Sequence, residues 1–438
     1  MKKIILSVAV ATMALSTSAF AEDKGIDIVT TGQAVVYYNT AANDSQDLFS
    51  ATEGVDNTRA NFGVQLNLDA DLKNGFTFGS QINYIGTLGL EKNLVNGVMQ
   101  TSNNPAPVTE DGLPISEVDS DRGIADDIYL SKIFIAKQIG NTTVKLGRQE
   151  LPKSLSPFAY SEGWNVFKNT FDAALVINTD IPDTTLVGAY VAGSNGNGFG
   201  NDMSDFDNLS VNNNAISGDA GFAINGTAYM LTAQNKSVPM TTITATYYDV
   251  NKVAGASDNS ATIIWADAAI ASKDLPMGLK VGLQGGQISP DLNAATEAAI
   301  GEKDTTAFGL KASIKPIDAL TVCAAYSSVD DGTVQIRNTG GVKTPLYTQM
   351  IANQGSIALD NDTIMLKGVY NTGDYGKIIL QGTQSSDNSS ASDDLLDIEL
   401  VYKVNVASMN VLVAYINQDF DTDARDTDIV RVVARYNF

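Results

Sequence analysis

The sequence predicts an all-β fold, namely a transmembrane antiparallel up-and-down β-barrel of about 18 strands, with 16 as the alternative count. Three observations predict it. Many segments alternate apolar and polar side chains, the connections alternate between short and long, and the chain begins with the pattern of an export signal. The mean hydropathy of −0.03 agrees, because the strands of such a barrel are apolar on one face only.

The N-terminal segment has the three parts of a secretory signal peptide. Lys2 and Lys3 are positive, residues 4–15 are mostly apolar, and Ala19 and Ala21 supply the small residues that a signal peptidase reads. A membrane anchor is the alternative, but this apolar run is shorter than the ~20 residues that a membrane helix needs. We expect residues 1–21 to be a signal peptide and residues 22–438 to form one barrel domain.

The clearest strand covers residues 60–72. Its even-numbered side chains are apolar, from Ala60 to Leu72, while its odd-numbered positions carry asparagine, glycine, glutamine and aspartate. Asn74-Gly75 follows, which is the strongest short signal for a hairpin turn. The same reading predicts strands at residues 28–38, 76–90, 128–138, 142–149, 171–180, 184–193, 222–234, 241–250, 260–272, 279–289, 305–314, 320–329, 363–371, 377–385, 394–403, 409–417 and 428–438.

The connections between these strands alternate in length. Long connections lie at residues 39–58, 91–126, 150–170, 194–221 and 330–362. Short turns lie at residues 73–75, 139–141, 181–183, 235–240, 273–278, 315–319, 371–376 and 404–408. Short turns on one side and long loops on the other are what a transmembrane barrel shows, whereas a sandwich has no reason to alternate in this way.

The last predicted strand places its aromatic and charged side chains on opposite faces. Tyr436 and Phe438 share the apolar face, while Arg431 and Arg435 lie on the other face, which lines the lumen of a barrel. The terminal Phe438, two residues after Tyr436, resembles the C-terminal assembly signal of bacterial outer-membrane barrels.

The composition excludes several chemistries. The sequence has no histidine and one cysteine, Cys323, so it holds no Ser-His-Asp triad, no Cys-His pair and no histidine-ligated metal. We therefore expect no enzyme and no cofactor. The net charge of −22 disfavours nucleic acid and suits cations. The acid-rich long connections could hold Ca²⁺ or Mg²⁺ through oxygen ligands, or could be a solvated surface that binds nothing specifically.

One interior segment carries a family resemblance. It contains Leu146-Gly-Arg-Gln-Glu-Leu151, then Trp164, then Asn169-Thr-Phe-Asp-Ala173. With the signal, the strand spacing and the terminal Phe438, it resembles the OprD-like porins and the major outer-membrane porins of Campylobacter-type bacteria. The resemblance implies an 18-stranded barrel in the lipid of a Gram-negative outer membrane, often a homotrimer, which passes ions and small solutes by diffusion.

In general porins the third outer loop folds inward and narrows the channel, and residues 150–170 are the third outer loop here. The candidate constriction residues on it are Glu150, Lys153, Glu162 and Lys168. The candidate pore-wall residues are Arg59, Lys145, Arg148, Arg431 and Arg435. Strand alternation places Arg148 outward, so either Gly147 marks a bulge or Arg148 lies above the lipid. No long basic stripe is evident, which leaves the class of solute open.

These features predict a general diffusion porin for ions and small hydrophilic solutes, with a preference for cations because of the acidic loops. The alternative is a barrel with an occluded lumen that serves as an adhesin or structural anchor. An outer-membrane protease or lipase ranks lowest, because histidine is absent. The sequence leaves open the favoured solute, the pore diameter, the gating and the residues at the narrowest point.

Overall fold

The computed structural model describes residues 26–50, 57–86, 95, 97–99, 127–199, 203–207, 209, 226–251, 258–389 and 393–438. The predicted signal peptide at residues 1–21 lies outside these ranges, as do most of the predicted long connections 91–126 and 194–221.

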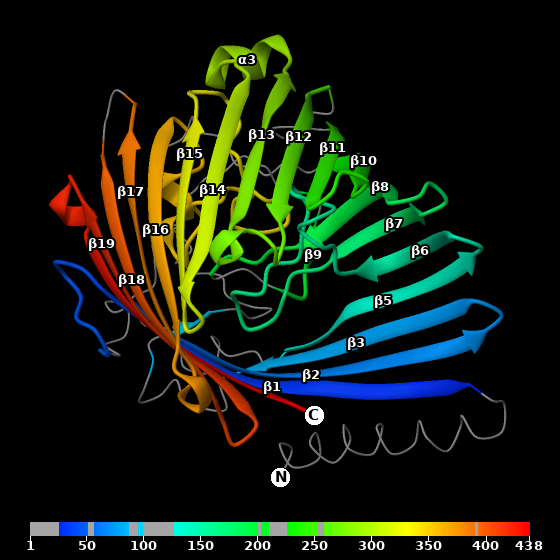
Figure 1. Cartoon of the computed structure of the whole chain (residues 1–438), viewed down its shortest axis with the longest axis horizontal. Helices are drawn as coiled ribbons and strands as arrows, with labels where there is room; N and C mark the ends of the chain where they lie inside the picture. Colours follow the sequence, from blue (N-terminus) through cyan, green and yellow to red (C-terminus); the bar gives the residue numbers. More distant parts are fainter. Residues whose placement is uncertain are drawn as a thin grey trace, which may run out of the picture.

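The described chain forms one sheet of twenty strands, of which eighteen close an antiparallel barrel (Figure 1). The barrel strands are β1 (Asp27–Ala42), β2 (Asn57–Lys73), β3 (Phe76–Gly86), β5 (Asp127–Ile139), β6 (Thr142–Gln149), β7 (Phe171–Asn178), β8 (Thr184–Asn195), β10 (Thr227–Asn235), β11 (Thr241–Asn251), β12 (Ser260–Ala271), β13 (Lys280–Asp291), β14 (Thr305–Ile317), β15 (Leu320–Val329), β16 (Asn361–Asn371), β17 (Lys377–Asp387), β18 (Leu395–Val406), β19 (Met409–Phe420) and β20 (Thr427–Asn437). Two further strands, β4 (Gly97–Val98) and β9 (Phe206–Asp207), have two residues each.

The fold class predicted from the sequence is confirmed, with eighteen barrel strands rather than sixteen. Every predicted strand overlaps an observed one. Two predicted ends, residues 87–90 and 222–225, lie outside the described residues.

The barrel closes where its first strand, β1, pairs with its last strand, β20. β1 pairs with β2 on one side and with β20 on the other, in register from Gln33 opposite Asn437 to Ala42 opposite Asp428. Gly32 N donates to Phe438 O over 2.7 Å and Phe438 N donates to Gly32 O over 3.0 Å. Closure matters because each unpaired backbone group in lipid costs several kcal/mol.

The hairpin between β2 and β3 forms at the predicted Asn-Gly turn. Asn74 (φ 53°) and Gly75 (φ 77°) both adopt the left-handed conformation. This twist matches that of the flanking strands, which is why Asn and Gly are favoured there.

The helical segments within the described residues are short. They are α3 (Ala294–Ile300) and the 3₁₀ turns η2 (Pro276–Gly278), η3 (Asn353–Ser356), η4 (Gly373–Tyr375) and η5 (Asp423–Arg425). In the described part of the chain, no helix is both long and apolar enough to cross a membrane.

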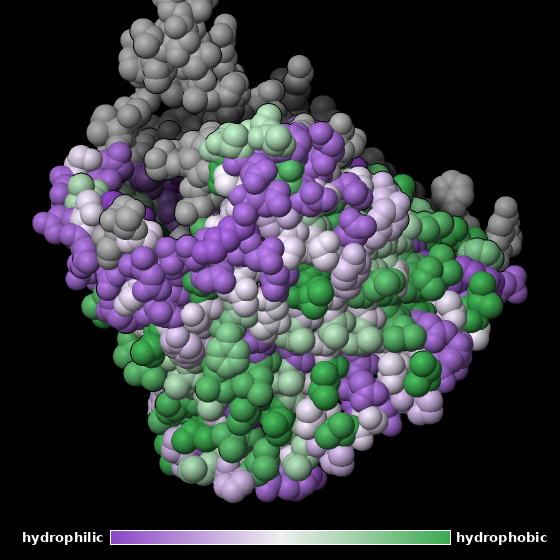
Figure 2. Space-filling model, turned by 90° about the horizontal axis from the view of Figure 1, so that it is seen from above, coloured by the Kyte–Doolittle hydropathy of each residue, from purple (hydrophilic) through white to green (hydrophobic). Residues whose placement is uncertain are grey.

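The outer face of the barrel is apolar. In β18, Leu396, Ile398 and Leu400 are exposed, while Asp397 and Glu399 between them are buried on the inner face. Figure 2 shows broad hydrophobic areas in the lower and right-hand parts of the view. Hydrophilic residues gather mainly in its upper part. This alternation is the one that lipid on the outside requires.

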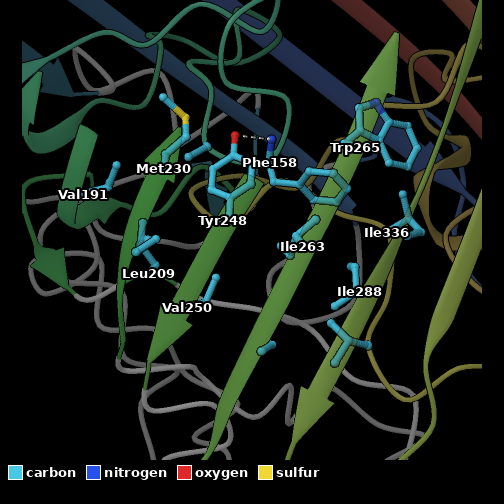
Figure 3. Packing of buried hydrophobic residues seen from close by; sticks show 14 of the residues in the cluster. Phe158, Val191, Leu209, Met230, Tyr248, Val250, Ile263, Trp265, Ile288 and Ile336 are labelled. Carbon is cyan, nitrogen blue, oxygen red and sulfur yellow. Dashed lines mark hydrogen bonds between the residues drawn. The ribbon is translucent and has the colours of Figure 1, made fainter. Parts of the chain in front are cut away.

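The inner face is not polar all round, which departs from the alternation predicted for a porin lumen. Inward-facing side chains of β8 and β10–β13 are buried and apolar, including Val191, Met230, Tyr248, Ile263, Trp265 and Ile288 (Figure 3). Phe158 packs edge-on against Tyr248 and Trp265, with ring centroids 6.0 and 5.3 Å away. Ile336 joins the same cluster. This sector of the barrel is filled, so open space must lie elsewhere.

The seam between β1 and β20 gives a testable prediction. A Cβ at position 32 would lie 2.5 Å from the Phe438 ring and 2.7 Å from Gln65 O. We expect Gly32→Ala to destabilise the barrel by about 1–3 kcal/mol through overpacking. The measurement is the temperature at which the folded band is lost on SDS gels.

Gly188→Ala is the matched control, because its Cβ would meet Leu231 at an ordinary 3.7 Å on another part of the wall. Equal transition temperatures for the two variants would contradict the importance of the seam.

Candidate functional site

Residues 150–170, which connect β6 to β7, cross the interior of the barrel. Thr232 Oγ1 of β10 donates to Leu155 O over 2.8 Å, and Phe158 N donates to the Tyr248 hydroxyl of β11 over 3.1 Å. Further along, Arg435 of β20 donates to Val166 O over 2.7 Å. The segment therefore contacts the β10–β11 wall and also the β20 wall. We call it loop 150–170.

A second segment, residues 330–360 between β15 and β16, also folds inward. We call it loop 330–360. Thr348 Oγ1 lies 2.5 Å from Ser327 Oγ of β15, and the Tyr347 hydroxyl donates to Asp267 of β12. Glu399 of β18 accepts hydrogen bonds from Ile351 N (2.6 Å) and Ala352 N (3.2 Å). Sequence reasoning treated this segment only as a long connection.

Glu162 joins the two loops. Its side chain accepts from Trp164 Nε1 (2.8 Å), Asn338 Nδ2 (2.8 Å), Lys343 N (2.7 Å) and Val342 N (3.1 Å). Glu162 is only 3 % exposed. A buried carboxylate is stable only when it is hydrogen-bonded in this way. The structure thus places Glu162 between the loops, where it holds them together rather than facing solutes.

A cavity of about 810 Å³ lies between the loops and the short turns of the barrel. Trp164, Lys343 and Ile351 line it at the loop end, and Gly373 and Asn405 line it at the turn end. Its charged lining residues are Lys343, Lys367, Lys377, Lys403, Arg431 and Arg435. None of the described residues that line it carries a carboxylate.

Two predicted wall residues, Arg431 and Arg435, line this cavity. Arg431 donates from Nε to Asn39 Oδ1 over 3.0 Å, and its guanidinium lies 5.6 Å from the ring centroids of Tyr37 and Trp164. Arg435 donates to the carbonyls of Val166 and Asn165. Both arginines are thereby fixed, and their charge stays inside the lumen.

The other predicted residues do not gather into one ring. Glu150 pairs with Lys132 (2.8 Å) and Lys168 (2.6 Å) beside β5 and β6. Burial alone would raise the pKa of the Glu150 carboxyl, but the two ammonium groups outweigh it and lower that pKa. Lys153 instead donates to Thr344 O over 3.1 Å, and burial lowers the pKa of its ammonium to about 8.

Two further candidate wall residues lie in β6 and near the start of β2, which follows a long connection. Lys145 of β6 places its ammonium 3.7 Å from the centroid of the Phe134 ring. Arg59 of β2 stands opposite Asn39 in register. Neither lines the described cavity.

Arg148 lies on the outer face and is not part of the pore wall. It pairs in register with Asp172, and its Nε and Nη2 donate to that carboxylate over 2.9 and 3.2 Å. Its guanidinium also lies 3.2 Å from the centroid of the Phe206 ring. The pairing across Gly147 is regular although its φ is +118°, so alternation is kept and no bulge turns Arg148 inward.

The basic lining was missed by sequence reasoning. Lys367, Lys377 and Lys403 come from three neighbouring strands, so no single segment shows a basic run. The sequence did carry one indication of this lining, because each lysine is an even number of residues away from the inward-facing residues of its own strand. Lys343 lies on loop 330–360, and its inward position could not be read from strand alternation.

Candidate metal ligands do not cluster. Among the described residues, no group of three or more Cys, Asp and Glu side chains is arranged to hold a metal ion. Ca²⁺ or Mg²⁺ at the acidic loops therefore stays a prediction.

The fold and cavity define a class of protein, a closed membrane barrel with two inward loops above a cavity lined by cationic side chains. No family model and no curated protein matches this sequence. Solved structures match over nearly the whole chain. Pseudomonas aeruginosa OccK8 (OprE) is 15 % identical with a TM-score of 0.71, and the match covers 94 % of this chain and 98 % of that one.

Two other solved structures match over a similar share of the chain. Pseudomonas aeruginosa OpdK with vanillate is 15 % identical with a TM-score of 0.67, covering 93 % of this chain and 98 % of that one. A BenF-like porin from Pseudomonas fluorescens Pf-5 is 14 % identical with a TM-score of 0.65, covering 94 % of this chain and 98 % of that one. The fold is thus that of outer-membrane porins, which supports the OprD-like part of the resemblance. The Campylobacter-type part stays a prediction.

The joint at Glu162 can be tested through Trp164, one of two tryptophans in the chain. We expect Glu162→Gln to weaken the contact between the loops by about 3 kcal/mol, because a buried amide leaves several donors without an acceptor. In a Trp265→Phe background, Trp164 emission should shift to the red and residues 330–360 should become sensitive to protease.

Glu297→Gln on α3 is the control, since Glu297 lies in a short exposed helix. Unchanged emission and protease resistance in Glu162→Gln would contradict the role of this carboxylate.

Proposed function

We propose that this chain is an outer-membrane channel that passes small hydrophilic solutes by diffusion. We propose further that the half of the channel nearer the short turns favours anions. The observation that carries the proposal is the cavity lining, which has six cationic side chains and no carboxylate among the described residues. Charged side chains along a pore wall select the sign of the permeating ion.

The strength of this selection comes from confinement. Two unit charges 4 Å apart interact by about 1 kcal/mol in bulk water and by about 4 kcal/mol near a protein surface, where the effective dielectric constant is lower. Several fixed positive charges around one cavity therefore raise the local anion concentration.

One of the similar solved structures agrees with this direction. The OpdK structure is a complex with vanillate, which is a carboxylate anion. That ligand belongs to OpdK. It supports, for this chain, a solute that carries a carboxylate.

A preference for cations is the second candidate. Acidic residues crowd the end of the barrel that bears the long loops, including Asp330, Asp331, Asp360 and Asp387. Burial, together with the charges of Asp331 and Asp387, raises the pKa of Asp360. The sequence as a whole has a net charge of −22. The acidic end of the barrel that bears the long loops would therefore attract cations before they reach the basic cavity.

Three further parts of the proposal rest on the resemblance. They are location in a Gram-negative outer membrane, contact with its lipid, and assembly as a homotrimer. An adhesin or anchor with an occluded lumen is the alternative to a channel.

Planar bilayers test the proposal. Purified protein should give discrete conductance steps, and a KCl gradient should give a reversal potential that shows Cl⁻ more permeant than K⁺. Preference for K⁺ would favour the acidic mouth as the selecting element. A properly inserted barrel without steps would support the adhesin or anchor.

Lys343 should make this selectivity depend on pH. Burial, aided by the charge of Arg431, lowers the pKa of its ammonium to about 7. Lys343 is therefore charged below pH 7 and neutral above it, so the preference for Cl⁻ should fall between pH 6 and 8.

Lys343→Met should reduce this pH dependence, measured as the reversal potential at each pH. The sequence has no histidine, and Lys153, whose pKa is about 8, does not line the cavity. A pH profile identical to that of the parent protein would contradict the assignment to Lys343.

A further inference from the structure

We infer that the cavity holds a binding site for a polyvalent oxoanion of the phosphate and polyphosphate class. The site lies toward the short turns and is formed by Lys367, Lys377 and Lys403. The inference rests on the proposed function, because it places the site inside the proposed channel. It goes further by naming a specific site, its ligand chemistry and the side of entry.

The three lysines share one face of three adjacent strands. Lys377 of β17 stands directly opposite Lys403 of β18 in register, and Lys367 of β16 stands opposite Gln381 of β17. All three line the cavity, as does Gln381. Lys367 is thus displaced along the wall from the Lys377–Lys403 pair, and all three lysines line the same cavity.

The turn before β17 fixes this arrangement. Gly376 has a φ of +95°, and a Cβ at this position would lie 2.2 Å from Lys403 O. Only glycine lets the turn lie so close to β18. The close approach holds the start of β17, and hence Lys377, against Lys403.

No protein carboxylate neutralises these lysines. Among the described residues, none of the three has a carboxylate within 4 Å, whereas Lys73, Lys132 and Lys303 each have one. The acids on the inner face of β18 make no ion pair with these lysines, and Asp397 Oδ1 has no hydrogen-bond partner. Glu399 accepts from Ile351 N and Gln381 Nε2, and Asp397 accepts from Gln418 Nε2 over 2.9 Å.

The uncompensated charge argues for a ligand with several negative charges. Like charges directly opposite each other on neighbouring strands are destabilising. A monovalent anion would neutralise one of three ammonium groups, whereas a polyphosphate can accept charge-assisted hydrogen bonds from all three. The bound oxoanion would thereby remove the repulsion between Lys377 and Lys403.

The position of the site sets the side from which the ligand enters. Lys377 follows η4, and both Lys377 and Lys403 are exposed. Lys403 also lies close to the short turn that follows β18. A ligand from the side of the short turns meets these lysines directly, whereas a ligand from the other side must first pass the two inward loops.

The experiment measures block of single channels by inorganic pyrophosphate at matched ionic strength, added to each side in turn, with acetate as the monovalent comparison. Pyrophosphate should interrupt the current at lower concentration than acetate, and more strongly from the side of the short turns. Lys377→Gln/Lys403→Gln should weaken the block by about tenfold or more, because two charged donors are lost.

The matched control is Lys280→Gln. Lys280 lies near the same end of the barrel, in β13, but does not line the cavity. Equal block by acetate and pyrophosphate, or equal loss of block in the control and the double variant, would overturn the inference.

Calorimetric binding of pyrophosphate to the detergent-solubilised protein separates this inference from the proposed function. Binding that is lost in Lys377→Gln/Lys403→Gln, in a protein that gives no conductance steps, would support the site and contradict the channel. Conductance steps without pyrophosphate binding would support the channel and contradict the site.

Discussion

The whole structure depends on the pairing of every backbone N–H and C=O group that faces lipid. An open sheet would leave two unpaired edges, so β1 must meet β20, and the register from Gln33–Asn437 to Ala42–Asp428 achieves this. Closure then encloses an interior, which must be occupied either by side chains and loops or by water. Gly32 and Phe438 exchange backbone hydrogen bonds at the last point of this seam, so Phe438 takes part in closing the barrel.

The interior is divided between an apolar filling and a charged cavity. Phe158 and Ile336, from the two inward loops, complete a hydrophobic cluster with the inner faces of β8 and β10–β13. Buried carboxylates fix the loops at their other contacts, Glu162 between the loops and Glu399 at the β18 wall. Because one side of the barrel is packed, the open space lies against β16–β20, and the cationic side chains there line it. The eccentric cavity is thus a consequence of how the loops pack.

The barrel could be predicted from the sequence because each strand faces lipid on one side and the alternation is local. The eighteen strands and the lumenal faces of Arg431 and Arg435 follow from that alternation, and the Asn74-Gly75 turn follows from the preference of Asn and Gly for the left-handed conformation. The site could be predicted only in part. Which loops fold inward depends on contacts between residues far apart in sequence, such as Lys343 N with Glu162. Strand alternation alone does not show that Ile263 and Trp265 face an apolar interior. That becomes evident only from the packing of Phe158 against this part of the wall. The basic lining is spread over several strands, so only the three-dimensional order of the strands brings it together.

The central claim is that solutes pass along the cavity lined by β16–β20. Its most direct test places a reactive thiol on that lining, with Lys367→Cys in a Cys323→Ser background, and follows single-channel current while an anionic methanethiosulfonate reagent is added. The account predicts a stepwise and lasting fall in current, because the modified side chain narrows the cavity and places a negative charge where Lys367 carries a positive one. Complete modification, confirmed by mass, with unchanged current would show that ions take another route and would contradict the account.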